Sequence, residues 1–125
     1  MILSVFIVAL VLIFITVKSI ISKIESNLKG LLNVEIKEIN LTQIEDGKYI
    51  GRYEVFPVAV EVEVAILDHK ISKIKIIEHE NGQGGSAEVI IDKVIEKQSL
   101  EVDVIAGATY SSKVILKAIE DALDR

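Results

Sequence analysis

The chain has 125 residues and a net charge of -5, which suits one domain of ordinary size once a terminal segment is set aside. The absence of Cys excludes disulfides, thiolate-held iron–sulfur clusters, c-type haem attachment and a lipid-modified N-terminal Cys. The acidic balance, without a basic stripe, argues against nucleic acid as a partner. The only histidines, His69 and His79, lack the paired spacing of a metal site and fall in or beside predicted turns, so we interpret both as surface residues.

The N-terminus carries the longest apolar run. Residues 1–17 contain no charged side chain, and they predict a transmembrane anchor over residues 1–19, which Ile20 and Ile21 can extend if Lys18 snorkels. A cleaved signal peptide is the competing interpretation, but the segment has no positively charged start and no Ala-x-Ala-like cleavage site. A buried core helix would need a larger core than so short a chain offers. We therefore favour an uncleaved anchor.

A helical stalk is predicted over residues 20–33, ending at Gly30 or Asn33. Its apolar positions recur at helical spacing and are Ile21, Ile24, Leu28, Leu31 and Leu32. Lys18, Lys23 and Lys29 follow the apolar run, so the positive-inside rule by itself would place the remaining domain, residues 34–125, in the cytoplasm.

The first half of the domain favours strands. Residues 34–41 alternate in part and suit a first strand, and Asp46-Gly47 is a turn signal ahead of a strand over residues 48–54. Residues 58–66 alternate Val with Glu, the pattern of a half-buried strand.

A short turn follows, and residues 71–77 then return as the next strand, so the connections predict an antiparallel meander. Strict alternation would place Ile71 and Lys73 on one side of this strand. We expect the carboxylates of Glu61 and Glu63 to lie opposite Lys73 and Lys75 as favourable cross-strand pairs.

The second half favours helices. Residues 78–85 are irregular and glycine-rich, which indicates a flexible linker, and no Gly-Lys-Ser/Thr closes them as a Walker loop. Ser86 is expected to cap a helix that runs to about Gln98, and a last helix is expected from near Ser111 to Leu123. Strands followed by helices predict an α+β fold with the helices packed on one face of the sheet.

A turn of small residues ending in three hydroxyls precedes the last helix. Residues 103–112 read Asp-Val-Ile-Ala-Gly-Ala-Thr-Tyr-Ser-Ser. A helix start offers unpaired N–H groups and positive potential to a phosphate, and Gly107 and Ala108 leave the backbone approachable. The same residues also suit an ordinary helix start at which Thr109 or Ser111 caps exposed N–H groups.

For a phosphate held on Thr109, the expected donors come from the first turn of the helix. If that helix starts near Ser111, the amides of Ser111, Ser112 and Lys113 face the phosphate. The ammonium of Lys113 lies four residues on, about one turn away.

This segment resembles the flavinylation motif of the FMN-binding domain family, which reads Asp, two variable residues, Ser or Thr, Gly, Ala, then Thr or Ser. Asp103 stands at the family's spacing, and Tyr-Ser-Ser-Lys follows as in many members. Ala106 departs from the pattern, because the family usually has Ser or Thr there. The resemblance covers roughly residues 46–124 and implies a membrane-anchored electron carrier that holds FMN as a phosphoester on Thr109.

The resemblance also implies a cofactor site and partners. The site residues are Asp103, Gly107, Ala108, Thr109, Tyr110, Ser111, Ser112 and Lys113. The family's His-x-x-Gly region lies near the flavin, which adds His79, with Asn81 and Gln83 as secondary candidates. A separate Mg-dependent flavin transferase that uses FAD attaches the FMN, so the chain needs no catalytic base, and Asp103 serves recognition by that enzyme or braces the turn.

The resemblance conflicts with the charge pattern on topology, because many anchored members expose the flavin domain outside the cytoplasmic membrane. Long translocated domains tolerate flanking charge, so we expect an extracytoplasmic domain and an unidentified redox partner protein. Two alternatives stay open. The same fold could bind FMN noncovalently, with Thr109 only hydrogen-bonding the phosphate, or the chain could be a flavin-free, membrane-tethered interaction or sensor module that binds a partner at its sheet edge.

Overall fold

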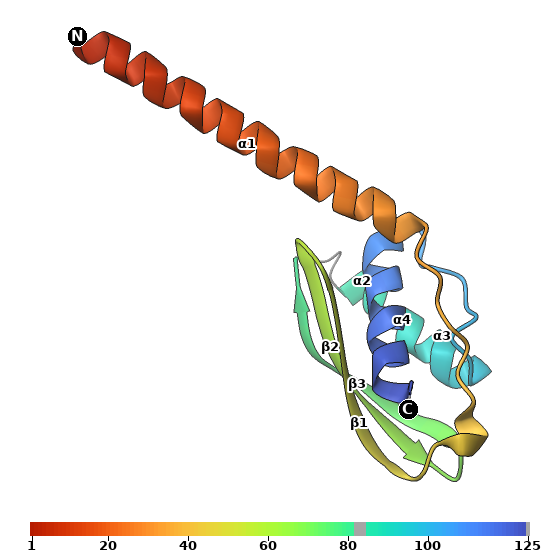
Figure 1. Ribbon diagram of the computed structural model, residues 1–125. Helices are drawn as coiled ribbons and strands as arrows, with labels where there is room; N and C mark the ends of the chain where they lie inside the picture. Colours follow the sequence, from red (N-terminus) through yellow and green to blue (C-terminus); the bar gives the residue numbers. More distant parts are fainter. Residues whose placement is uncertain (82–84, 125) are drawn as a thin grey trace.

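The computed structural model describes residues 1–81 and 85–124 (Figure 1). In chain order the elements are helix α1 (Ile2–Leu32), the 3-10 turn η1 (Leu41–Gln43), strands β1 (Gly47–Val55), β2 (Val58–Leu67) and β3 (Lys70–Glu80), and helices α2 (Gly85–Glu88), α3 (Ile90–Lys97) and α4 (Thr109–Leu123). Figure 1 shows α1 projecting from a small domain in which the other helices lie against one face of the sheet. The predicted α+β class is confirmed.

The three strands form an antiparallel sheet in the order β1-β2-β3, which confirms the predicted meander. The alternation in β2 has the expected effect, because Val60, Val62 and Val64 are fully buried while the residues between them are partly exposed. These valines face the helices and form the centre of the core together with the buried side of α4. The opposite face of the sheet carries most of the charged side chains.

Strand β3 departs from the predicted strict alternation because it contains two bulges. Ile66 pairs with Ile71 and Ala65 with Lys73, so Ser72 is an extra residue. The bulge turns Ile71 to the core face, where it is 2% exposed, so its expected place beside Lys73 is wrong.

The second bulge changes one of the expected charge pairs. Val62 pairs with Ile76 and Glu61 with Glu78, which makes Ile77 the extra residue. Glu63 does lie opposite Lys75, as expected. Glu61 does not meet a lysine, and its carboxylate instead lies 3.6 Å from the guanidinium of Arg52 on β1.

Two other expected elements differ from the structure. Residues 34–40 form no strand and run as an extended segment along the domain, held by side-chain hydrogen bonds such as that from the Lys37 N–H to the Glu120 carboxylate at 3.2 Å. The single helix expected from Ser86 to Gln98 is two helices interrupted at Val89, and Ser86 lies inside α2 rather than capping it. Gln98, in the left-handed conformation, ends α3 as expected.

Helix α1 is continuous from the apolar run through the predicted stalk and ends at Asn33, not at Gly30. Its large apolar residues between Met1 and Ile21 are exposed, and the helix is long and apolar enough to cross a membrane. Its last turns belong to the domain, because Leu31 is 1% exposed within the core and Asn27 donates a hydrogen bond to the Phe56 carbonyl at 3.1 Å.

Helix α4 packs directly on the sheet at Gly51. A Cβ at this position of β1 would overlap the Ala118 carbonyl oxygen and the Ala122 nitrogen of α4. The absence of a side chain at Gly51 therefore sets how closely α4 approaches the sheet, and so where the start of α4 lies.

Candidate functional site

Helix α4 begins at Thr109, two residues before the start expected from the sequence. Its N-cap residue is Ala108, and no side chain of the described residues makes a capping hydrogen bond there. The Ser112 N–H donates to the Ala108 carbonyl at 2.9 Å, so this amide belongs to the helix and does not point out of its end, contrary to the expectation. Only the amides that precede the first hydrogen-bonded amide of a helix point out of its N-terminal end. The N–H donors available to a phosphate are therefore nearer Thr109 and Tyr110 than expected.

A tight turn delivers the chain into α4. The Ala108 N–H donates to the Ile105 carbonyl at 2.9 Å, and Gly107 between them has φ +78°. This φ suits glycine at the third position of a turn, and a Cβ there would meet no atom within 4 Å. Ala106 and Gly107 are exposed, so the backbone before Thr109 is accessible.

The third hydroxyl of the motif braces this turn. The Ile105 N–H donates to Ser112 Oγ at 3.1 Å, and Ser112 is fully buried. Ser111 is also fully buried, whereas Thr109 and Tyr110 are partly exposed. Of the three hydroxyls that begin α4, that of Thr109 therefore belongs to the residue with the greatest access to solvent.

His79 lies under this end of α4 and is not a surface residue, so that expectation is wrong. Its side chain is 7% exposed, its Nε2 lies 3.4 Å from Ser111 Oγ, and its Nδ1 lies 3.6 Å from a carboxylate oxygen of Glu88 on α2. That Nδ1 is buried and has no hydrogen-bond partner within the described part of the chain. The bulge at Ile77 explains the placement, because it puts His79 opposite Val60 on the core face.

The other candidates are less closely grouped. Lys113 lies one turn into α4, but its ammonium donates to the Val34 carbonyl at 3.3 Å. Asp103 is exposed before the turn, and Asn81 is exposed after β3 with φ +54°. Gln83 lies outside the described residues. His69, by contrast with His79, is exposed as expected, in the turn between β2 and β3.

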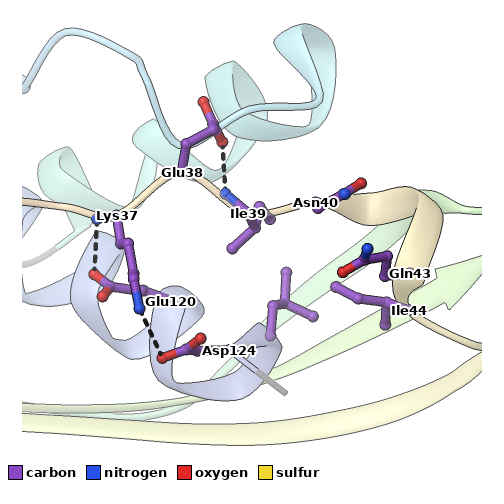
Figure 2. A pocket seen from close by; sticks show the side chains of 9 residues that line it. Lys37, Glu38, Ile39, Asn40, Gln43, Ile44, Glu120 and Asp124 are labelled. Carbon is purple, nitrogen blue, oxygen red and sulfur yellow. Dashed lines mark hydrogen bonds and ion pairs between the residues drawn. The ribbon is translucent and has the colours of Figure 1, made fainter.

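A hollow lies at the opposite end of α4 (Figure 2). Its volume is about 190 Å³, and it is lined by Lys37, Glu38, Ile39, Asn40, Gln43, Ile44, Glu120, Leu123 and Asp124. Figure 2 shows Lys37 meeting two acidic residues at the end of α4, through its N–H to Glu120 and through its ammonium to Asp124, the C-cap residue, at 3.9 Å. The hollow is smaller than usual ligand sites, and the C-terminal end of a helix is unfavourable for a phosphate, so the start of α4 is the better candidate.

The resemblance to the family places His79 and Ser111 in one cofactor site, but the sequence did not predict that they touch or that Glu88 lies beside them. The three residues come from β3, α4 and α2, and only the bulge at Ile77 and the packing of the helices bring them together. If side chains alternated strictly along this strand, His79 would lie on the face of the sheet that points away from the helices. The residues next to His79 in the sequence therefore do not predict this cluster.

Comparison with known proteins identifies the domain to which this end of α4 belongs. Residues 57–124, more than half of the chain, match the family model described as the FMN-binding domain. A segment of 66 residues is 36% identical to urocanate reductase of Eggerthella lenta and covers 50% of this chain but 11% of that protein. The chain thus spans a small part of the length of this relative. The match contains β2, β3 and all of α2, α3 and α4, and the chain therefore belongs to the FMN-binding domain family, with FMN as its cofactor.

Proposed function

We propose that this protein is a membrane-anchored electron carrier in which FMN is attached through its phosphate to the Thr109 hydroxyl. The observation that carries the proposal is the start of α4, where Thr109 is the first helical residue, the N-cap residue Ala108 has no capping hydroxyl or carboxylate, and the preceding turn is open. Such an end provides N–H donors and positive potential to a phosphate.

The surroundings of Thr109 fit this group. Exposed Ala106 and Gly107 leave space for the ribityl phosphate beside the backbone. The buried Nδ1 of His79, which has no hydrogen bond among the described residues and lies 3.6 Å from Glu88, offers a polar atom beneath the same end of α4. Lys113 contributes positive charge one turn away, although its ammonium is hydrogen-bonded to Val34. The bound flavin would supply the one- and two-electron redox chemistry, and the protein would hold and tune it.

Under this proposal the chain has no need of a catalytic base, because a separate flavin transferase that uses FAD forms the phosphoester. Asp103 is exposed beside the turn, a position that suits recognition by that enzyme. The name of the relative from Eggerthella lenta, a reductase, is consistent with a redox role for the shared segment.

The anchor is α1, whose apolar residues are exposed over the first five turns. Twenty residues from Ile2 to Ile21 span about 30 Å as a helix, the thickness of a bilayer's hydrocarbon core. We propose that residues 1–19 form the anchor, residues 20–33 the stalk and residues 34–125 the FMN-binding domain, which lies outside the cytoplasmic membrane.

Thr109→Val tests the attachment. The protein is produced together with a flavin transferase, and flavin fluorescence is followed through denaturing electrophoresis and by intact mass. Valine has nearly the shape of threonine but no hydroxyl, so we expect the variant to fold and to lose the fluorescent band and the added mass completely.

Two matched controls accompany this experiment. Thr42→Val makes the same change in the exposed turn η1, and Ser112→Ala removes a buried hydroxyl of the motif; both should retain the fluorescent band. A fluorescent Thr109→Val band would exclude this residue as the attachment point. A wild-type protein that is yellow in solution but loses its flavin in denaturant would support the noncovalent alternative.

A further inference from the structure

The turn between β1 and β2 holds an exposed aromatic residue close to α1. Val55 pairs with Val58, so the turn consists of Phe56 and Pro57, and the Phe56 side chain is 49% exposed. The hydrogen bond from Asn27 Nδ2 to the Phe56 carbonyl, 3.1 Å long, fixes this turn against the side of α1. Figure 1 shows the corresponding end of the sheet just beneath the helix.

The position of Asn27 along α1 gives the level of the turn. The apolar run that contains the proposed anchor can extend to Ile21, and Asn27, six residues further along the helix, lies about 9 Å beyond it. A headgroup layer extends about 5–8 Å beyond the hydrocarbon core on each side. Lys23, between these two residues, is exposed, as expected of a residue at the level of the headgroups. The turn that Asn27 holds is therefore just outside the headgroup layer, close enough for an exposed Phe side chain to reach into it.

We propose that the β1–β2 turn rests on the membrane surface, with the Phe56 side chain in the headgroup layer. The membrane that contacts Phe56 is the one that α1 is proposed to span, so this inference rests on the proposed anchor. The exposed apolar ring of Phe56 gains free energy when it leaves water for the boundary between headgroups and acyl chains, where Trp, Phe and Leu of membrane-surface segments lie. Because α1 is docked on the domain, a second contact at Phe56 would limit the tilt of the whole molecule against the membrane.

In this orientation the start of α4 lies at the end of the domain that α1 joins. The hydrogen bond from Lys113 to the Val34 carbonyl places the second turn of α4 beside the end of α1, and Figure 1 shows the start of α4 directly below that end. Val34 follows Ile21 by 13 residues, so by the rise of the helix the flavin proposed on Thr109 would lie about 20 Å from the hydrocarbon core. A redox partner that is itself resident in the membrane would reach it there.

Tryptophan fluorescence tests the depth of Phe56, because the chain contains no Trp. Phe56→Trp is placed in phosphatidylcholine vesicles with and without lipids brominated near the headgroup end of the acyl chains. The matched control is Leu67→Trp, also at an exposed turn residue, 57% exposed, at the other end of β2 and about 30 Å away. Each variant is compared in vesicles with and without brominated lipid, so quenching by the flavin is the same in both samples and cancels.

We expect the emission of the residue introduced at position 56 to shift to shorter wavelength and to be quenched by the brominated lipid. Iodide in the aqueous phase should quench the residue introduced at position 67 more strongly. The inference would be overturned if iodide quenched both residues equally and brominated lipid did not quench the residue at position 56. If the protein then still resisted carbonate extraction, the proposed anchor would stand. Release by carbonate would refute the anchor and the inference together.

A second pair of variants covers a failure of Phe56→Trp to fold. The chain also lacks Cys, so Phe56→Cys and Leu67→Cys can each carry one polarity-sensitive fluorophore. The label at position 56 should report an apolar environment only in vesicles, and the label at position 67 should report water throughout. An aqueous signal from position 56 in vesicle-bound protein would contradict the inference.

Discussion

At the start of α4, three neighbouring hydroxyl residues have different environments. Thr109 is partly exposed and first in the helix, Ser111 is buried 3.4 Å from His79, and Ser112 accepts a hydrogen bond from the Ile105 N–H. The two serines therefore shape the site from below, which leaves Thr109 as the residue that a modifying enzyme could reach. The sequence motif does not show which of the three hydroxyl groups is exposed and which are buried.

At the same scale, one missing side chain decides how α4 meets the sheet. Gly51→Ala would place a Cβ against the Ala118 carbonyl and the Ala122 nitrogen, which are backbone atoms and cannot move aside. We expect a loss of unfolding free energy of about 1–3 kcal/mol or more from this overlap. Urea denaturation in detergent micelles, followed by circular dichroism, measures it.

Gly30→Ala is the matched control, since it makes the same change within helix α1, where a Cβ would meet no atom within 4 Å. It should stabilise the helix by about 0.5–1 kcal/mol. If both variants unfolded at the same urea concentration as the wild type, α4 would not pack on β1 as closely as described.

At the scale of elements, the extended segment between α1 and η1 is held to the segment after α3 by one carboxylate. Glu38 accepts hydrogen bonds from Ser99 Oγ at 2.6 Å and from the Leu100 N–H at 3.4 Å. Partial burial raises the pKa of this carboxyl, but hydrogen bonds from Ser99, the Ile39 N–H and the Leu100 N–H outweigh that effect, so the net pKa lies below its ordinary value of 4.5.

The lowered pKa of Glu38 predicts a dependence of stability on acid. A carboxyl with a lower pKa in the folded state contributes stability above pH 4.5, and this contribution is lost as the pH falls through the folded-state value. Glu38→Gln should therefore be less stable than the wild type at pH 7, and the difference should shrink below pH 4.5. Thermal unfolding across pH 3–7 measures both curves.

Glu35→Gln serves as the control, because Glu35 is an exposed carboxylate in the same extended segment. Its stability should follow that of the wild type across the same range. A constant gap between Glu38→Gln and the wild type at every pH would show that ionisation of Glu38 does not contribute to holding the two segments together.

At the scale of the whole molecule, a long apolar helix and a small charged domain form one continuous structure. Leu31 lies in the domain core although it belongs to α1, and Asn27 bonds to the β1–β2 turn. The stalk is therefore docked on the domain over its last turns. The lysines that a protease would recognise, Lys18, Lys23 and Lys29, are exposed and precede Leu31.

This arrangement predicts the result of a topology experiment. If the domain is extracytoplasmic, trypsin added to intact spheroplasts should cut the stalk and release a soluble, flavin-bearing fragment. Cleavage after any of the three lysines leaves Leu31 in the fragment, so its core stays complete and the fragment should remain folded. Fluorescence of the supernatant and the fragment mass provide the measurement.

A cytoplasmic marker protein that stays intact is the control for unbroken spheroplasts. Protection of the whole chain until the membrane is lysed would instead support the positive-inside interpretation of Lys18, Lys23 and Lys29 and a cytoplasmic electron carrier. The proposed attachment of FMN to Thr109 does not depend on the side of the membrane, so that result would leave it unaffected.

The sequence by itself determined the features that depend on local pattern. The apolar run of α1, the alternating valines of β2 and the Gly-Ala-Thr turn before α4 predicted an α+β domain, a candidate span and the family. These predictions succeeded because hydrophobic periodicity and turn chemistry act between residues close together in the chain.

Only the tertiary structure decided where β3 bulges, where α4 begins and which residues surround it. The bulges at Ser72 and Ile77 follow from register with β2, and they bring His79 beneath α4. Leu31 joins the core only because α1 docks on the domain, and α4 approaches β1 only because Gly51 lacks a side chain. Each of these features is set by packing between distant segments, whose free energy no local pattern encodes.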